Sequence, residues 1–206
     1  MKTKGYLVIG CALAILLGRA AAANDAQIHF KLPNCPTEMT LFATDAFRGA
    51  VSQEELLKAY QPFLFAETQG VFATTSPENP DIALLVVEPN KIREVQGTVT
   101  PEQFSQVKAA MLAKNPSSAV VEANEILKER DTSINEYDGI VQSSTDTSAT
   151  VTLVLDGTTT GANFTSLAGF KMIYADKCLV GVILIAPKSS VARRDFEELI
   201  QRISVE

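Results

Sequence analysis

The sequence predicts an α+β fold: a single domain with a mainly antiparallel sheet and two or three helices packed on it. The central stretch Cys178–Ile185 reads Cys-Leu-Val-Gly-Val-Ile-Leu-Ile. A short apolar run with β-branched residues is typical of a strand buried on both faces. Two strand-like stretches, Ala149–Leu155 and Leu167–Tyr174, precede it closely enough to form an antiparallel meander. Glycines and threonines in Asp156–Asn163 predict the turn between them.

Further strands are expected in the first half of the chain. Asp25–Lys31 and Thr40–Thr44 are short strand candidates, and Ile82–Val87 is a second continuous apolar run that predicts another interior strand. The segments Phe63–Phe65 and Val71–Thr75 are separated by a Gln-Gly pair and resemble a hairpin.

Two helices are marked by capping patterns. One begins at Ser52, with Glu55 three residues later. The other is capped by Thr100, Gln103 completes its capping box, and the Asn-Pro pair ending at Pro116 is expected to stop it.

The segments around the acidic middle of the chain and the C-terminus complete the predicted fold. Ala119–Glu129 and Ser133–Ser144 alternate loosely and are expected to be longer, partly exposed strands. A last helix follows the central strand, with four apolar residues on the face expected to pack on the sheet: Phe196, Leu199, Ile200 and Ile203. Arg193, Arg194, Glu197 and Glu198 are expected to face water.

The N-terminus has the pattern of a signal peptide, residues 1–23. Lys2 and Lys4 give a positive start, Leu7–Leu17 is the apolar core, and small residues offer a cleavage site between Ala23 and Asn24. We therefore expect an exported protein, periplasmic or secreted, whose single domain is residues 24–206.

The N-terminus also allows two other interpretations. It could be a retained membrane anchor with Arg19 as its stop, but the apolar run of about a dozen residues is shorter than the roughly 20 needed to span a bilayer. Val-Ile-Gly-Cys ending at Cys11 resembles a lipobox, which would make the protein a lipoprotein. Most apolar residues lie after Cys11, which favours a cysteine inside an ordinary signal peptide and no stable membrane span after cleavage.

The charge of the chain argues against two classes of partner. It has 18 basic and 24 acidic residues, a formal net charge of −6. Cleavage after Ala23 removes three basic residues and no acidic one, so the charge of the remainder becomes −9. That sign disfavours nucleic acid and anionic lipid headgroups as partners.

Two cysteines, Cys35 and Cys178, remain after cleavage. In an oxidising compartment a pair of cysteines favours a disulfide. The bridge would tie the N-terminal segment to the central strand, while two separate buried thiols are the alternative.

Motifs for catalysis and cofactor binding are sparse. His29 is the only histidine, so histidine-dependent catalysis would have to use it, and a partly exposed strand residue is the simpler interpretation. No phosphate-loop or dinucleotide fingerprint occurs, and we expect no cofactor and no metal site. Six carboxylates surround one presumed hairpin and could include an acid–base pair, although a solvated acidic rim is favoured: Glu122, Glu125, Glu129, Asp131, Glu136 and Asp138.

The order of elements resembles the PsbP-like superfamily of small α/β proteins. The similarity lies in the early hairpin, the capped helix Pro101–Lys114, the antiparallel run Ala119–Ile185 and the C-terminal Asp-Phe-Glu-Glu-Leu-Ile-Gln-Arg-Ile. It carries no diagnostic motif, and Leu-Pro-Asn-Cys stands where that family has a proline–glycine–tryptophan-type turn. The resemblance implies a non-catalytic accessory or binding module with no functional residues to transfer.

The sequence therefore predicts an exported, non-enzymatic accessory or binding module of the bacterial cell envelope. Its partner would be an unknown protein or a small apolar ligand, and a second copy could pair with it through a sheet edge. Two alternatives stay open. One is a carrier of an apolar small ligand between the last helix and the sheet, and the other is a carboxylate-dependent hydrolase built on the acidic cluster Glu125 to Asp138.

Overall fold

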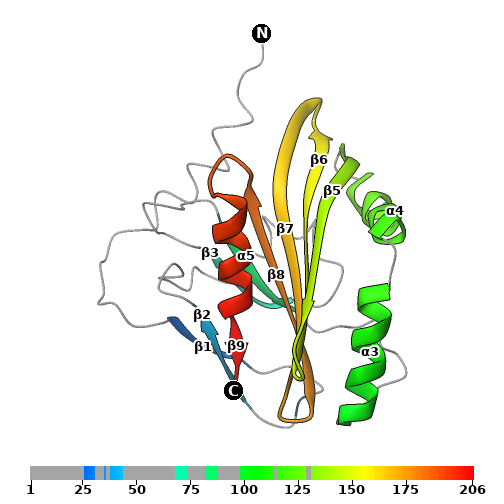
Figure 1. The fold of residues 1–206 in the computed structure, drawn as a ribbon. Helices are drawn as coiled ribbons and strands as arrows, with labels where there is room; N and C mark the ends of the chain where they lie inside the picture. The colour runs from blue at the N-terminus through cyan, green and yellow to red at the C-terminus, as the bar shows by residue number, and fades with distance from the viewer. Residues whose placement is uncertain are drawn as a thin grey trace.

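The computed structural model describes residues 26–30, 35, 38–43, 68–73, 82–87, 98–113, 116–128 and 131–206. The predicted signal peptide with Cys11 and its cleavage site, the helix expected from Ser52, and the strand Phe63–Phe65 lie outside these residues. The described part contains two antiparallel sheets and three helices (Figure 1).

The larger sheet has six strands, and every neighbouring pair in it is antiparallel. Its strands, in the order in which they lie side by side, are β3 (Thr68–Ala73), β4 (Ala83–Val87), β8 (Cys178–Pro187), β7 (Ala162–Ala175), β6 (Ser148–Thr159) and β5 (Thr132–Ser144). The predicted meander from β6 to β8 is therefore present, and the apolar runs at β4 and β8 both form interior strands.

Strand β8 lies between β4 and β7 and is the most deeply buried strand that the structure describes. The side chains of Val180, Val182 and Leu184 are fully buried, and Leu179 is buried in a separate cluster. This confirms that the first half of β8 is covered on both faces, because successive side chains of a strand point to opposite faces.

The smaller sheet joins the two ends of the described chain. Strand β2 (Met39–Ala43) pairs with β1 (Ala26–Phe30) on one side and with β9 (Ser204–Val205) on the other. Thr40 and Glu206 also exchange two main-chain hydrogen bonds, of 2.7 and 3.0 Å. Strands at β1 and β2 were expected, but β9 was not, because two residues are too few to show a strand pattern.

Helix α5 (Arg193–Arg202) packs on one face of the larger sheet. As expected, Phe196, Ile200 and Ile203 are buried. The contact is close at Gly169 on β7, where a Cβ atom would lie only 2.6 Å from Ile200 Cδ1. The same hydrophobic cluster includes side chains of β2, so α5 and the smaller sheet cover the same face of the larger sheet.

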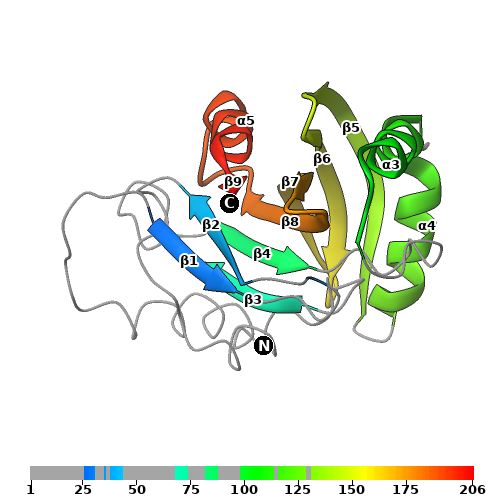
Figure 2. The ribbon, with the colours of Figure 1, turned by 90° about the horizontal axis from the view of Figure 1, so that it is seen from below.

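Helix α3 (Pro101–Ala113) packs on the opposite face, near β6 and β7 (Figure 2). The predicted capping box is present: Thr100 N donates to Gln103 Oε1 at 2.8 Å, and Gln103 N donates to Thr100 Oγ1 at 3.2 Å. Phe104 is buried and stacks on Tyr174 with ring centroids 5.2 Å apart. The Tyr174 hydroxyl donates to Val99 O at 3.0 Å, which holds the start of α3 against the sheet.

The strand predicted at Ala119–Glu129 is wrong: this segment belongs to helix α4 (Pro116–Leu127). Pro116 does not simply end α3, because it occupies the first position of α4, where a proline costs no hydrogen bond. Ala123 and Leu127 are buried and four residues apart, which is the spacing of one helical face. The loose alternation of apolar and polar residues in this segment obscured the helical spacing.

The turn predicted over Asp156–Asn163 is much shorter in the structure. Strands β6 and β7 continue to Thr159 and from Ala162, and only Thr160 and Gly161 turn the chain, both with positive φ. The threonines of this segment are β-branched and favour extended strands, which outweighed the turn-forming glycines.

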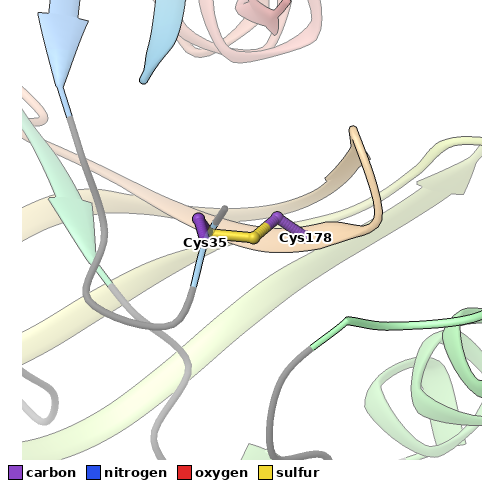
Figure 3. The surroundings of a disulfide bond; sticks show 2 residues. All are labelled: Cys35 and Cys178. Atoms are coloured by element: carbon purple, nitrogen blue, oxygen red, sulfur yellow. A yellow bond between two sulfur atoms is a disulfide. The ribbon is translucent and has the colours of Figure 1, made fainter. Parts of the chain in front are cut away.

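Cys35 and Cys178 form a disulfide, with the two sulfur atoms 2.05 Å apart (Figure 3). Both cysteines are buried. The bridge connects the segment between β1 and β2 to the first residue of β8, and so links the smaller sheet covalently to the larger one.

Candidate interaction surface at the outer edge of strand β5

Strand β5 is the last strand of the larger sheet, and α4 covers the start of its outer edge (Figure 1). The Asn124 side chain of α4 accepts a hydrogen bond from Ile134 N at 2.7 Å and donates one to Ile134 O at 2.8 Å. It thus pairs with β5 as a neighbouring strand would. The hydroxyls of Ser117 and Tyr137, 2.7 Å apart, make a second contact between α4 and β5.

A bulge interrupts β5 between Asp138 and Val141. Gly139 has a φ of 57°, a conformation that favours glycine, and its carbonyl oxygen accepts a hydrogen bond from the Arg193 guanidinium of α5. Arg193 also forms an ion pair with Glu197 at 2.8 Å. Helix α5 therefore fixes the position of the bulge.

Beyond the bulge, the outer edge of β5 has no strand partner among the described residues. Thr145 N donates to Ser148 O at 2.9 Å, so these two residues form a hydrogen-bonded pair of the β5–β6 ladder. Hydrogen-bonded and non-hydrogen-bonded pairs alternate along an antiparallel ladder. The N–H and C=O groups of Gln142 and Ser144 consequently point away from β6.

Helices lie on the two faces of this part of β5. The Gln142 side chain donates to Leu112 O of α3 at 3.0 Å, whereas Ser143 Oγ accepts from Gln201 of α5 at 2.5 Å. Ile140 and Val141, which lie between the bulge and these two hydrogen-bonded residues, are 40% and 44% exposed. They are two of the three large hydrophobic side chains that are exposed in the described part of the chain.

The acidic residues singled out from the sequence do not come together as a catalytic pair. Glu122 and Glu125 belong to α4, Asp131 directly precedes β5, and Glu136 and Asp138 belong to β5. Those whose side chains are described are all exposed: Glu125, Asp131, Glu136 and Asp138. The side chains of Glu122 and Glu129 lie outside the described residues. An acid–base pair needs two carboxylates held close together in different environments, and these exposed side chains do not form such a pair.

His29 is exposed on β1, and its Nδ1 atom lies 3.0 Å from Thr40 Oγ1 on the neighbouring strand. Within the described residues, no group of three or more His, Cys, Asp or Glu side chains could hold a metal ion. This contact joins two residues that lie opposite each other, so His29 supports the pairing of β1 and β2.

Lys171 on β7 was not singled out from the sequence, yet among the residues that the structure describes it is the one buried side chain with a charge. Its Nζ atom donates to three carbonyl oxygens at the end of α5: Ile200 at 3.2 Å, Gln201 at 2.6 Å and Ile203 at 2.7 Å. Burial lowers the pKa of Lys171 to about 8. The three carbonyls use all three ammonium protons, so this lysine caps the helix and is not free to act as a nucleophile.

An open hollow of about 480 Å³ lies beside Lys171 at the C-terminal end of α5. Its lining mixes apolar and polar residues, among them Thr147, Ile173, Asp176 and Ile203. A carrier of an apolar ligand was expected to hold its cavity between α5 and the sheet. That contact is closely packed at Gly169.

The alternation of inward and outward side chains along β7 could have indicated that Lys171 is buried. Leu167, Gly169 and Ile173 are buried on the face toward α5, and Lys171 has the same parity. A lysine at an inward position of a strand requires oxygen partners, and the last turn of a following helix supplies unpaired carbonyls.

No helix in the described part of the chain is long and apolar enough to cross a membrane.

No protein-family model matches this sequence, and no curated protein matches it. Among solved structures, the Ran-binding protein Mog1p of Saccharomyces cerevisiae is similar with a TM-score of 0.43 and 10% sequence identity, over 89% of this chain and 96% of that chain. A point mutant of Mog1 is similar with a TM-score of 0.42 and 10% identity, over 88% and 95% of the two chains. At these scores the likeness assigns neither a family nor a function, and the resemblance to the PsbP-like superfamily stays a prediction.

Proposed function

We propose that this chain is an exported, non-enzymatic binding module of the bacterial cell envelope that holds another protein at the outer edge of β5. The observation that carries the proposal is that α4 covers only the first half of this edge. The Asn124 side chain forms hydrogen bonds with both the N–H and the C=O group of Ile134. The main-chain groups of Gln142 and Ser144 have no strand partner among the described residues.

Strand addition to such an edge is a common mode of peptide recognition, because main-chain hydrogen bonds supply affinity and neighbouring side chains supply specificity. Sheet edges left open also promote unwanted aggregation, and proteins protect them with bulges, charges or covering elements. Here the bulge at Gly139 and the side chain of Asn124 protect one half only. The exposed side chains of Ile140 and Val141 beside the unprotected half support a role in binding.

The hydrolase alternative receives no support from the carboxylates that were its basis, because those described are exposed. A hydrolase activity that is abolished by replacing Glu136 or Asp138 would contradict the proposal. Neutral substitutions at these positions, Glu136→Gln and Asp138→Asn, make that comparison without removing side-chain volume.

Site-specific photocrosslinking tests the docking site in the protein as it is produced in its own cell. A photoreactive phenylalanine analogue at Ile140 should yield a covalent adduct of one defined mass. The same analogue at Thr160, which is exposed at the opposite end of β6, is the matched control and should not. The Ile140 adduct should disappear in a Ser144→Pro background and persist with Ser144→Ala; equal adducts at both sites would overturn the proposal.

Export is tested by the intact mass of the protein from the envelope fraction. We expect the mass of residues 24–206 less two hydrogens, as required by cleavage after Ala23 and one disulfide. A mass that includes residues 1–23, or a lipid on Cys11, would overturn the assignment as a soluble exported module.

A further inference from the structure

The outer edge of β5 beyond its bulge offers a short and defined set of hydrogen-bonding groups. Gln142 and Ser144 each present one N–H and one C=O, so an added antiparallel strand can form hydrogen bonds with both residues. The bulge at Gly139 bends the strand and ends this regular stretch on one side, and the turn at Thr145 ends it on the other. A partner strand here must therefore be short.

The charged residues of β5 and its neighbouring strands are acidic. Residues 131–170, which comprise β5, β6 and the first part of β7, contain five acidic residues and no basic one. Glu136, Asp138 and Asp146 are exposed on or next to β5. The cations that reach β5 from the helices are already engaged: Arg193 pairs with Glu197, and Lys108 Nζ donates to Thr145 O at 2.7 Å.

We infer that the edge of β5 at Gln142 and Ser144 takes an extended segment of a partner protein in which apolar residues alternate with lysine or arginine. This inference rests on the proposed function and specifies the chemistry of the partner. The apolar side chains of the segment cover Ile140, and its cations lie on the other face, toward Val141 and the carboxylates of Glu136 and Asp138. Opposite charges across neighbouring strands stabilise their pairing.

A second copy of this chain is the competing occupant, and the charges disfavour it. Two copies paired through β5 would bring the same carboxylates together, and like charges opposite each other destabilise strand pairing. Asp138 and Asp146 flank this stretch, and in the antiparallel register centred on Gln142 each of them lies opposite the other aspartate of the second copy. The chain should therefore be monomeric through this edge at micromolar concentration.

Three peptides of about ten residues test the inference on the mature protein. In each, valine alternates with a second residue, which is lysine in the first peptide, glutamate in the second and serine in the third. We expect the lysine peptide to bind at least about tenfold more tightly than the other two at low salt, and this preference should shrink as salt screens the charges.

Variants separate strand pairing from simple charge attraction. Ser144→Pro removes an outward N–H without removing a hydrogen bond to β6, and Ser144→Ala is its matched control. The lysine peptide should lose about tenfold or more in affinity for Ser144→Pro and bind Ser144→Ala normally. A lysine peptide with alternate main-chain nitrogens methylated cannot pair as a strand and should bind the unaltered protein equally weakly, which keeps the test valid if Ser144→Pro does not fold.

Charge is tested with two triple variants that lose the same number of carboxylates. Glu136→Gln, Asp138→Asn and Asp146→Asn together should abolish the preference for lysine. The control, Glu38→Gln, Glu102→Gln and Glu198→Gln, removes three exposed carboxylates from other elements and should leave the preference unchanged.

The outcomes distinguish this inference from the proposed function. If all three peptides bind equally and all depend on Ser144, the docking edge stands and the basic partner is wrong. The reference is the affinity of the unaltered protein for the lysine peptide. If Ser144→Pro binds the lysine peptide that tightly, and the unaltered protein binds the methylated peptide that tightly, the peptide does not add a strand and the inference is wrong. If no peptide binds, the inference is also wrong, and the Ile140 photocrosslink alone then decides whether β5 is a docking edge.

Discussion

The side-chain amide of Asn124 lies 2.7 Å from the main-chain nitrogen of Ile134 and 2.8 Å from its carbonyl oxygen. One side chain on α4 thus satisfies both outward-pointing main-chain groups of an edge-strand residue. The equivalent groups of Gln142 and Ser144 on the same strand have no strand partner among the residues that the structure describes.

Asn124→Ala should lower the free energy of unfolding by about 1–3 kcal/mol, because it leaves two part-buried main-chain groups without their partner. Chemical denaturation of the variant beside the unaltered protein measures the loss. Glu125→Ala, an exposed neighbour on the same helix, is the control and should change stability by less than about 0.5 kcal/mol. Equal effects of the two substitutions would contradict the role assigned to Asn124.

Lys171→Met should destabilise the protein by about 1–3 kcal/mol, since three carbonyls at the end of α5 lose their donor. The loss should be greatest near β9, which follows Ile203 directly. Amide hydrogen exchange at Glu206 and Thr40, whose N–H groups bond to each other's carbonyls, should accelerate in the variant. Unchanged exchange at both amides would show that Lys171 does not hold the C-terminal strand.

The pH dependence of stability should carry the signature of Lys171. Burial lowers its pKa to about 8 in the folded protein, below the value near 10.4 of an unfolded chain. Between these values the unfolded chain binds more protons, so the contribution of Lys171 to the free energy of unfolding rises with pH. The difference in stability between the unaltered protein and Lys171→Met should therefore increase from pH 8 to pH 10, by at most about 3 kcal/mol. A difference that is flat or falls over this range would contradict the lowered pKa.

Loss of the disulfide should cost up to about 5 kcal/mol, the chain-entropy value for a loop closed across a sequence separation of 143. The double variant Cys35→Ser and Cys178→Ser, compared with the oxidised protein by chemical denaturation, measures this loss. A reducing agent should lower the stability of the unaltered protein and leave the double variant unaffected. Insensitivity of the unaltered protein to reduction would contradict a stabilising bridge.

The elements predicted correctly are those whose signals are local. The capping box at Thr100 and Gln103 marks the start of α3 by hydrogen bonds within one turn, and the apolar run of β8 needs no neighbour to be recognised. Helix α4 was misread because its short apolar period is ambiguous between strand and helix when no flanking cap settles it. Strand β9 exists only through its pairing with β2, which the sequence around it does not reveal.

The candidate surface could be predicted only in part. An acidic stretch near β5 was evident, and so was the general expectation of an open sheet edge. The covered half of the edge depends on two contacts with helices: Asn124 of α4 bonds to Ile134, and Arg193 of α5 bonds to Gly139. Contacts of this kind become visible only when the order of the strands is known.

The pairing of β2 with β9 makes the last residues of the chain part of the sheet that its first strands begin. During synthesis, β1 and β2 emerge long before the residues that complete their sheet, and Cys35 likewise waits for Cys178. A chain that stops before Ser204 leaves the β9 side of β2 unpaired, and incompletely folded chains of this kind are subject to chaperones and proteases. The smaller sheet is therefore completed only once β9 has been synthesised, which is later than every other strand that the structure describes.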